Sequence, residues 1–254
     1  MSMIIGMAGK GGTGKTTLAG LAVRYLAKIG KVPILAVDAD SNANLADVLG
    51  MDYEHTLSEA REEMKSSAGN VSITKDTLIE LRTQEAIVEG DDFDLVVMGQ
   101  PEGSGCYCAA NSILSAVLEK TLNNYPYQVI DNEAGMEHIS RLTARYMDIF
   151  FVISDASRRG LTAALRIWKL VDDLKIRIQH KYLIINRVRG DLSPEVKDII
   201  EKEGLNLAGI IPDDSVIYNA DQNGEPTSFL TDSSPAVKAA LGIFEKTLVE
   251  DKAA

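Results

Sequence analysis

A glycine-rich segment near the start of the chain, GKGGTGKTT at residues 9–17, constrains the fold more than any other part of the sequence. It follows a short apolar run, Met3–Ala8, and precedes a segment with helical spacing of apolar residues, Thr16–Lys28. A glycine, four further residues and then Gly-Lys-Thr match the phosphate-binding P-loop pattern, in the strand–loop–helix context that this pattern requires. The sequence therefore predicts a site for nucleotide phosphates at the end of a buried first strand.

The residue types of this loop suit phosphate and magnesium. Glycines let backbone N–H groups curl around phosphate without a clash from Cβ atoms, and the N-terminus of the following helix adds partial positive charge. We expect Lys15 to contact the β- and γ-phosphates and the hydroxyl of Thr16 to bind Mg²⁺. The predicted nucleotide contacts of the loop are Gly11, Gly12, Thr13, Gly14, Lys15, Thr16 and Thr17.

Beyond this loop, short apolar runs alternate with helical patterns along the chain. Most of the runs are continuous in Val, Ile and Leu, which is typical of strands buried on both faces of a parallel sheet. The alternation predicts one α/β domain over residues 1–254, with a single doubly wound, mostly parallel sheet and helices on both faces, as in P-loop NTPases. The predicted strands are Met3–Ala8, Pro33–Asp38, Leu95–Met98, Gln128–Asp131, Ile149–Ser154, Tyr182–Asn186 and Ala208–Ile211. The predicted helices include Thr16–Lys28, Asn111–Asn123, Gly160–Leu174 and Pro194–Lys202.

Residues 52–92 interrupt this alternation. They include the polar segments YEHTLSEAREEMKSS and TKDTLIELRTQEAIVEGDD, which we interpret as a helical surface insertion before the third predicted strand. Two interpretations of this surface stay open, a solvated face or a contact with a protein partner.

Charge and apolar content restrict the partners and the location. The chain of 254 residues has a net charge of −11, which argues against broad binding to nucleic acid or to anionic membranes. No apolar run reaches the roughly 18 residues of a membrane span, and Met1–Ala8 lacks the basic flank and cleavage site of a signal peptide. Residues 234–254 have helical apolar spacing but an acidic tail, so we expect them to pack on the core. We therefore expect a cytoplasmic protein with no nucleic-acid or membrane partner.

Carboxylates stand at the carboxyl ends of predicted strands, where α/β sheets bind ligands. Asp38 and Asp40 come at the end of the second strand, and Asp131 ends the strand in YQVIDNEAGMEH. An aspartate in such a position can orient a water molecule for in-line attack on a γ-phosphate. The alternative is a cap on the strand end with no catalytic role.

The only two cysteines of the chain, Cys106 and Cys108, lie one residue apart in GSGCYCAANS. Thiolates bind zinc, copper(I), nickel and iron–sulfur clusters, and a closed thiolate site usually takes four of them. One Cys-x-Cys supplies only half of such a set. In a reducing cytosol a structural disulfide is not expected, so the pair consists of metal ligands, redox groups or small apolar residues of a loop.

The glycine-rich loop also holds a second lysine, Lys10. The pattern Lys-Gly-Gly-x-Gly-Lys-Thr resembles the deviant Walker A motif of the MinD, ParA and nitrogenase iron-protein class of ATPases. The resemblance covers nearly the whole chain, because later motifs follow in the expected order. It implies ATP hydrolysis with Mg²⁺ in a homodimer, with Lys10 reaching the phosphates bound by the other subunit.

The resemblance also implies roles for residues at the strand ends. Asp40 would orient the attacking water, and Asp38 would support the P-loop and the magnesium shell. Asp131 would hold a magnesium-bound water. Gly135 would let the backbone of the segment Asp131–His138, the second switch of the family, approach the γ-phosphate. Many relatives have proline directly after the aspartate that corresponds to Asp40, where this chain has Ser41.

The base side of the site is predicted from two later segments. LIINRVR places Asn186 at the end of a buried strand, and an amide offers a donor and an acceptor to an adenine edge. GIIPDDS places Pro212 and Asp213 in a second loop. The resemblance implies that all three residues contact the base.

Two segments, MGQPEGSGCYCAANSIL and NEAGMEHISR, look like those of accessory ATPases that mature carbon monoxide dehydrogenase and acetyl-CoA synthase, the CooC type. That family is implicated in nickel insertion. The resemblance implies that Cys106 and Cys108 of two subunits together bind Ni²⁺, and Zn²⁺ fits the same thiolates. The dehydrogenase or the synthase would be the client.

Two other functions share these motifs. An iron–sulfur carrier or reductase like the nitrogenase iron protein would bridge a cluster with the same cysteines, although the second switch, Asp131–His138, has no cysteine. A positioning ATPase like ParA or MinD would need a basic surface or a basic membrane helix, and the acidic charge disfavours it.

Overall fold

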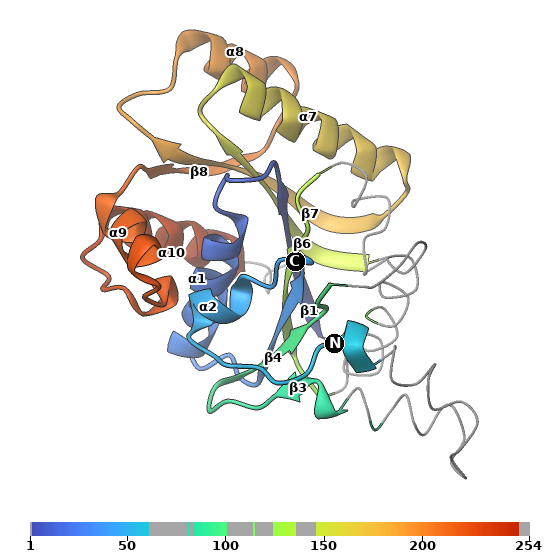
Figure 1. Ribbon diagram of the computed structural model, residues 1–254. Helices are drawn as coiled ribbons and strands as arrows, with labels where there is room; N and C mark the ends of the chain where they lie inside the picture. The colour runs from blue at the N-terminus through green and yellow to red at the C-terminus, as the bar shows by residue number, and fades with distance from the viewer. Residues whose placement is uncertain are drawn as a thin grey trace.

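The computed structural model describes residues 2–60, 81, 84–100, 114, 124–135 and 146–248. They form an eight-stranded sheet in the order β3-β4-β2-β5-β1-β6-β7-β8 (Figure 1). Neighbouring strands are parallel, except that β3 is antiparallel to β4. The strands are β1 (Met3–Gly9), β2 (Ile34–Ala39), β3 (Ile87–Val88), β4 (Phe93–Val97), β5 (Tyr127–Asn132), β6 (Tyr146–Asp155), β7 (Arg177–Val188) and β8 (Leu207–Pro212). The predicted fold class is therefore confirmed.

Helices cover both faces of this sheet. Figure 1 shows α1, α2, α9 and α10 on one side and α7 and α8 on the other. The helices are α1 (Lys15–Lys28), α2 (Leu45–Leu49), α7 (Arg158–Asp173), α8 (Pro194–Lys202), α9 (Ser215–Asn223) and α10 (Pro235–Leu248), with a 3₁₀ turn η1 (Thr227–Phe229). None of the helices in the described part of the chain is long and apolar enough to span a membrane.

Alternate side chains of the central strands supply two separate cores. In β2, Leu35 and Val37 belong to the apolar cluster that includes α7, whereas Ile34 and Ala36 belong to the cluster that includes α1 and α10. Successive strand residues point to opposite faces. Because both faces are buried, the central strands appear in the sequence as continuous apolar runs.

Each predicted strand corresponds to an observed one, and α8 has the predicted bounds. The helical interpretation of residues 52–92 is wrong at Ile87–Val88, because these residues pair with β4 as the edge strand β3. Residues 61–80 and 82–83 of that insertion lie outside the described residues. So does the predicted helix Asn111–Asn123, apart from residue 114.

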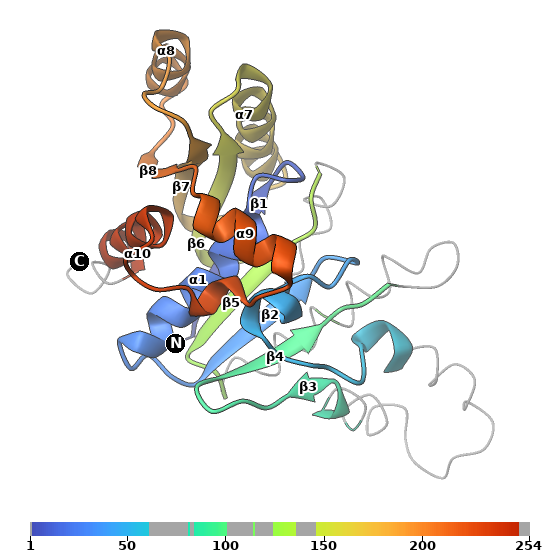
Figure 2. The ribbon, with the colours of Figure 1, turned by 60° about the vertical axis from the view of Figure 1, so that its left-hand side comes forward.

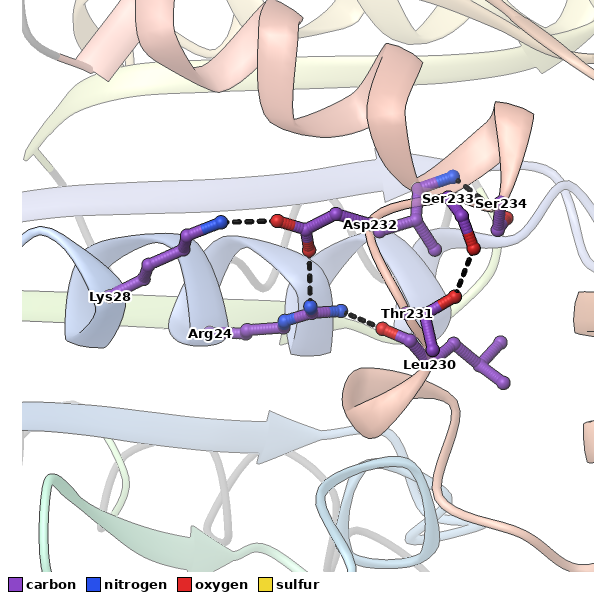
Figure 3. A network of polar contacts seen from close by, with 8 residues as sticks. Arg24, Lys28, Leu230, Thr231, Asp232, Ser233 and Ser234 are labelled. Atoms are coloured by element: carbon purple, nitrogen blue, oxygen red, sulfur yellow. Dashed lines mark hydrogen bonds and ion pairs between the residues drawn. The ribbon is translucent and has the colours of Figure 1, made fainter.

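A polar network ties α1 to the turn before α10. The carboxylate of Asp232 accepts hydrogen bonds from Arg24 and Lys28 of α1, and Arg24 also donates to the carbonyl oxygen of Leu230 (Figure 3). These side chains are partly exposed, so each ion pair contributes little to stability. They connect the helix that begins in the glycine-rich loop to the segment before α10.

Candidate nucleotide site

The glycine-rich loop joins β1 to α1 at the edge where the parallel strands end, and its shape depends on glycine. Gly14 has φ of 89°, a left-handed conformation that residues with a Cβ atom avoid. A Cβ atom on Gly14 would lie only 2.4 Å from Nδ2 of Asn186. Glycine is therefore required here both for backbone conformation and for space.

Several carbonyl oxygens of this loop are already bonded within the protein. The carbonyl of Lys10 accepts from the N–H (3.3 Å) and from Oγ1 (2.8 Å) of Thr13. The carbonyl of Thr13 accepts from Nδ2 of Asn186 at 2.8 Å. Among the described groups, nothing accepts from the N–H groups of Gly12, Gly14, Lys15 and Thr16. The loop and the first turn of α1 thus present unpaired donors, as a phosphate site requires.

Two buried carboxylates lie side by side next to this loop. Asp38 of β2 and Asp131 of β5 are paired residues, 0% and 1% exposed. Burial raises the pKa of Asp38 to about 7, and the charge of Asp131 adds to the rise. Burial also raises the pKa of Asp131 to about 6, although a hydrogen bond from Thr16 and the charge of Lys15 oppose it. Two such carboxylates resist being ionised together unless a cation joins them.

Asp131 has an oxygen available for such a cation. Its Oδ1 is buried and has no hydrogen-bond partner among the described residues. Within the same residues, no three His, Cys, Asp or Glu side chains gather as a metal site. Mg²⁺ prefers oxygen ligands and keeps waters and substrate phosphates in its shell. Thr16 and Asp131 therefore fit a magnesium ion that arrives with a nucleotide.

Asp38 supports the loop that follows β2. Its Oδ1 accepts from the N–H of Asp40 at 3.0 Å, and its Oδ2 accepts from the N–H of Leu45, the first residue of α2, at 2.7 Å. Both oxygens are therefore engaged by backbone donors. This arrangement fixes the position of Asp40 relative to the end of β2.

One carboxylate oxygen of Asp40 accepts hydrogen bonds, and the other has no donor among the described residues. Its Oδ1 accepts from the N–H (3.0 Å) and from Nδ2 (2.9 Å) of Asn42. No described residue donates to its Oδ2, and the residue is 8% exposed. A fixed carboxylate with one free oxygen suits the orientation of a water molecule. Asn42 was not predicted, because nothing in the spacing of the motif identifies it.

The P-loop also lies close to the second switch. A Cβ atom on Gly11 would be 3.8 Å from Cβ of Ala134. The next residue, Gly135, has φ of 119°, which favours glycine. Across this region Ser41 donates to Oε1 of Glu133 at 3.4 Å, so the segments after β2 and β5 contact each other.

A pocket of about 440 Å³ extends from the P-loop between α1, α2 and α9. Figure 2 shows these three helices gathered on one side of the sheet. The predicted base-side residues Asn186, Pro212 and Asp213 all line this pocket. Ile217 and Tyr218 of α9 line it as well and were missed, because α9 itself was not predicted.

Two of the base-side residues already bond within the protein. Nδ2 of Asn186 donates to the P-loop, and its Oδ1 accepts from the N–H of Arg187 at 2.9 Å. Each end of this amide keeps capacity for one further bond. The carboxylate of Asp213 accepts from Arg189 at 2.6 Å. The polar groups at this end therefore have less free bonding capacity than those of the loop.

The two lysines of the P-loop differ in exposure. Lys15 is 6% exposed, whereas Lys10 is exposed and its side chain has no partner among the described residues. Cys106 and Cys108 lie outside the described residues.

Comparisons with known proteins identify the family. The sequence profile of the CbiA family, the CobQ/CobB/MinD/ParA nucleotide-binding domain, matches residues 4–227. An ATP-binding protein of Methanocaldococcus jannaschii, itself uncharacterized, is 38% identical over 250 residues, which cover 97% of this chain and 98% of the relative. The carbon monoxide dehydrogenase accessory protein CooC of Rhodospirillum rubrum is 31% identical over 238 residues, which cover 87% of this chain and 88% of the relative.

Solved structures share the fold. A chain of the MinC:MinD cell division protein complex of Aquifex aeolicus has a TM-score of 0.73 at 22% identity, with 98% of this chain and 96% of that chain covered. MinD of Pyrococcus horikoshii, complexed with Mg-ADP, has a TM-score of 0.70 at 24% identity, with 97% and 96% covered. The profile match over residues 4–227, with the relative that is 38% identical, shows that the chain belongs to the CobQ/CobB/MinD/ParA family of ATP-binding P-loop ATPases.

Proposed function

We propose that the protein is an ATP-dependent homodimeric metallochaperone that binds nickel and promotes metal insertion into carbon monoxide dehydrogenase/acetyl-CoA synthase. The observation that carries this proposal is the 31% identity to CooC of Rhodospirillum rubrum, together with the Cys-x-Cys pair Cys106 and Cys108. The proposed nickel site is supported by the sequence alone. The proposed nucleotide site is also supported by the arrangement of the described residues around the P-loop.

ATP hydrolysis would take place at the P-loop. Unpaired N–H groups and the buried Lys15 stabilise negative charge on the phosphates. Mg²⁺ held by Thr16 and Asp131 would neutralise charge between the phosphates. Asp40, anchored by Asn42 at one oxygen, orients a water for in-line attack through the other, which yields ADP and phosphate.

Dimerisation would complete this site. The exposed Lys10 has no partner among the described residues, so its ammonium group is available to another subunit. The resemblance to deviant Walker A ATPases implies that it reaches the phosphates of that subunit. ATP would then hold two subunits together.

The same closure would complete the metal site. Cys106 and Cys108 of each subunit supply two thiolates, and two subunits supply the four that a closed site takes. Metal affinity then rises with ATP occupancy, and by linkage metal favours the ATP-bound dimer by the same factor. Hydrolysis loosens the dimer, leaves two ligands on each chain and releases nickel to the client.

Equilibrium dialysis of Ni²⁺ tests this mechanism. With a non-hydrolysable ATP analogue we expect one tightly bound nickel per two chains, and much weaker binding without nucleotide. The variant with Cys106→Ala and Cys108→Ala should lose this binding but keep its affinity for ADP. One nickel per chain, or binding that survives in the double variant, would contradict the shared site.

An iron–sulfur carrier or reductase is the alternative, because the same four thiolates can bridge a cluster. Protein purified without oxygen would then be brown and absorb visible light. A nickel or zinc thiolate site predicts colourless or weakly coloured protein.

A further inference from the structure

The carboxyl end of β7 carries one residue more than its partner strand. Between the last two paired positions, β7 has Asn186 and Arg187 where β8 has only Ile211. Such a β-bulge changes the direction of side chains, and bulges concentrate next to functional sites. This one lies where β7 ends beside the P-loop.

The backbone of the bulge is held in an unusual conformation. Arg187 has φ of 57°, in the left-handed region that a residue with a Cβ atom rarely adopts. Its N–H donates to Oδ1 of Asn186 at 2.9 Å, which helps to hold this conformation. Residues in sparsely populated backbone regions cluster at functional sites.

The bulge lets two successive side chains reach one loop. In a regular strand, neighbouring side chains point to opposite faces. Here Nδ2 of Asn186 donates to the carbonyl of Thr13 at 2.8 Å, and Nη1 of Arg187 donates to the carbonyl of Gly12 at 3.2 Å. Two consecutive P-loop carbonyls are thus held by two consecutive residues of β7.

We propose that Arg187 is a positioning residue of the nucleotide site, which braces the P-loop through the carbonyl of Gly12. In a trans peptide the C=O and N–H groups point in opposite directions. Holding the carbonyl of Gly12 therefore keeps the N–H of Thr13 directed at the carbonyl of Lys10, the bond that closes the turn. The loop is ordered before a nucleotide arrives, which lowers the entropy lost on binding.

A neighbouring arginine provides a matched control. The carboxylate of Asp213 lies 3.8 Å from Nε of Arg187 and 2.6 Å from Nε of Arg189. Both guanidinium groups thus share one partner on the β8 side, but only Arg187 bonds to the P-loop. Arg189 is 84% exposed. Replacing either arginine removes one positive charge near Asp213, but only the replacement of Arg187 removes the hydrogen bond to the P-loop.

Titration of Arg187→Gly and Arg189→Ala with fluorescent ADP tests the brace. The test depends on the ATP site of the family and requires neither nickel nor a client protein. Arg187→Gly keeps a residue that suits the bulge and removes the guanidinium. We expect about fivefold weaker ADP binding, or about 1 kcal/mol, whereas Arg189→Ala changes it less than about twofold. Arg187→Lys, which keeps a charged donor, should recover part of the affinity. Equal losses in Arg187→Gly and Arg189→Ala, or no loss in either, would overturn the role.

Hydrogen exchange of the nucleotide-free protein separates bracing from direct contact with the nucleotide. A brace predicts faster exchange of the Thr13 amide, which donates to the carbonyl of Lys10, in Arg187→Gly, with an unfolding midpoint like that of Arg189→Ala. Unchanged exchange of this amide would overturn the proposal, because Arg187 would then act only on the bound ligand.

Discussion

The phosphate end and the base end of the nucleotide pocket are built differently. At the phosphate end, one continuous segment, residues 9–17, presents unpaired N–H groups, and the carbonyls of residues 10 and 12–14 are bonded within the protein. At the base end, β7, β8, α2 and α9 each contribute part of the wall. There the polar side chains of Asn186 and Asp213 already have partners.

This difference indicates where the binding free energy comes from. Donors that are already in place need no reorganisation when a phosphate binds, so each contributes nearly its full interaction. The base end offers apolar surface, and its polar side chains can form few further hydrogen bonds because they already bond within the protein. We therefore expect large losses from changes at the phosphate end and small ones at the base end.

The largest loss is expected for Gly14→Ala. The new Cβ atom would be forced into a left-handed conformation and within 2.4 Å of Asn186, so ADP affinity should fall by about a hundredfold or more. Gly30→Ala is the control, because Gly30 has a similar φ of 71° with nothing within 4 Å. Calorimetric titration with Mg-ADP measures the affinity of both variants. A similar loss of ADP affinity in Gly30→Ala would show that backbone strain, and not the clash with Asn186, causes the effect.

Asp40→Asn should affect turnover and leave binding intact. In the proposed mechanism Asp40 orients water and does not hold phosphate, so we expect kcat for phosphate release to fall about a hundredfold and ADP affinity to change less than about twofold. Asp47→Asn, an exposed residue of α2 that also lines the pocket, should leave kcat unchanged. A parallel loss of ADP affinity in Asp40→Asn would place Asp40 in the binding part of the site.

The paired carboxylates predict a pH dependence of stability. With pKa values of about 7 for Asp38 and about 6 for Asp131, the folded protein keeps protons that the unfolded chain loses near pH 4. Without metal, the free energy of unfolding should therefore fall as pH rises from 5 to 8, by up to about 1.4 kcal/mol per pH unit for each carboxylate that stays protonated only in the folded state. Mg-ADP affinity should rise over the same range, because the cation competes with protons.

Urea denaturation in EDTA at several pH values measures this slope. Asp38→Asn removes one of the two titrating groups, so its stability should depend less steeply on pH than that of the wild type. The same slope in both proteins would contradict the assignment of the protons to this pair.

The smallest effect is expected at the base end. Tyr218→Ala removes part of the exposed wall formed by α9, and we expect about threefold weaker ADP binding. Val216→Ala on the same helix does not touch the pocket and should have no effect. A loss at Tyr218 as large as that of Gly14→Ala would invalidate the contrast between the two ends.

The contrast also explains which parts could be predicted from sequence. The P-loop is local, since its glycines, its lysine and the start of α1 follow one another, and its type and place were predicted. The central strands were recognised because both faces are buried. Asp38 and Asp131 lie together because parallel strands end at the same edge of the sheet.

The base end depends on contacts between distant segments. The bulge at Arg187 exists only relative to the register of β8, so no local pattern indicates it. Helix α9 buries only Ala220 and gives little periodic signal. Its ends could have revealed it, because Asp214 caps the first turn and Gly224 ends it in a left-handed conformation. The edge strand β3 was missed because its two residues are too few to form a recognisable run.

Light scattering after size exclusion, with metal analysis of each peak, tests the central claim most directly. The nucleotide-free, ADP-bound and ATP-analogue-bound proteins would each be loaded with Ni²⁺. We predict a dimer with one nickel per two chains in the ATP-analogue state, and chains with little nickel in the other two. Nickel bound at one per chain, or a metal content that does not change with the nucleotide, would contradict a thiolate site shared between two subunits.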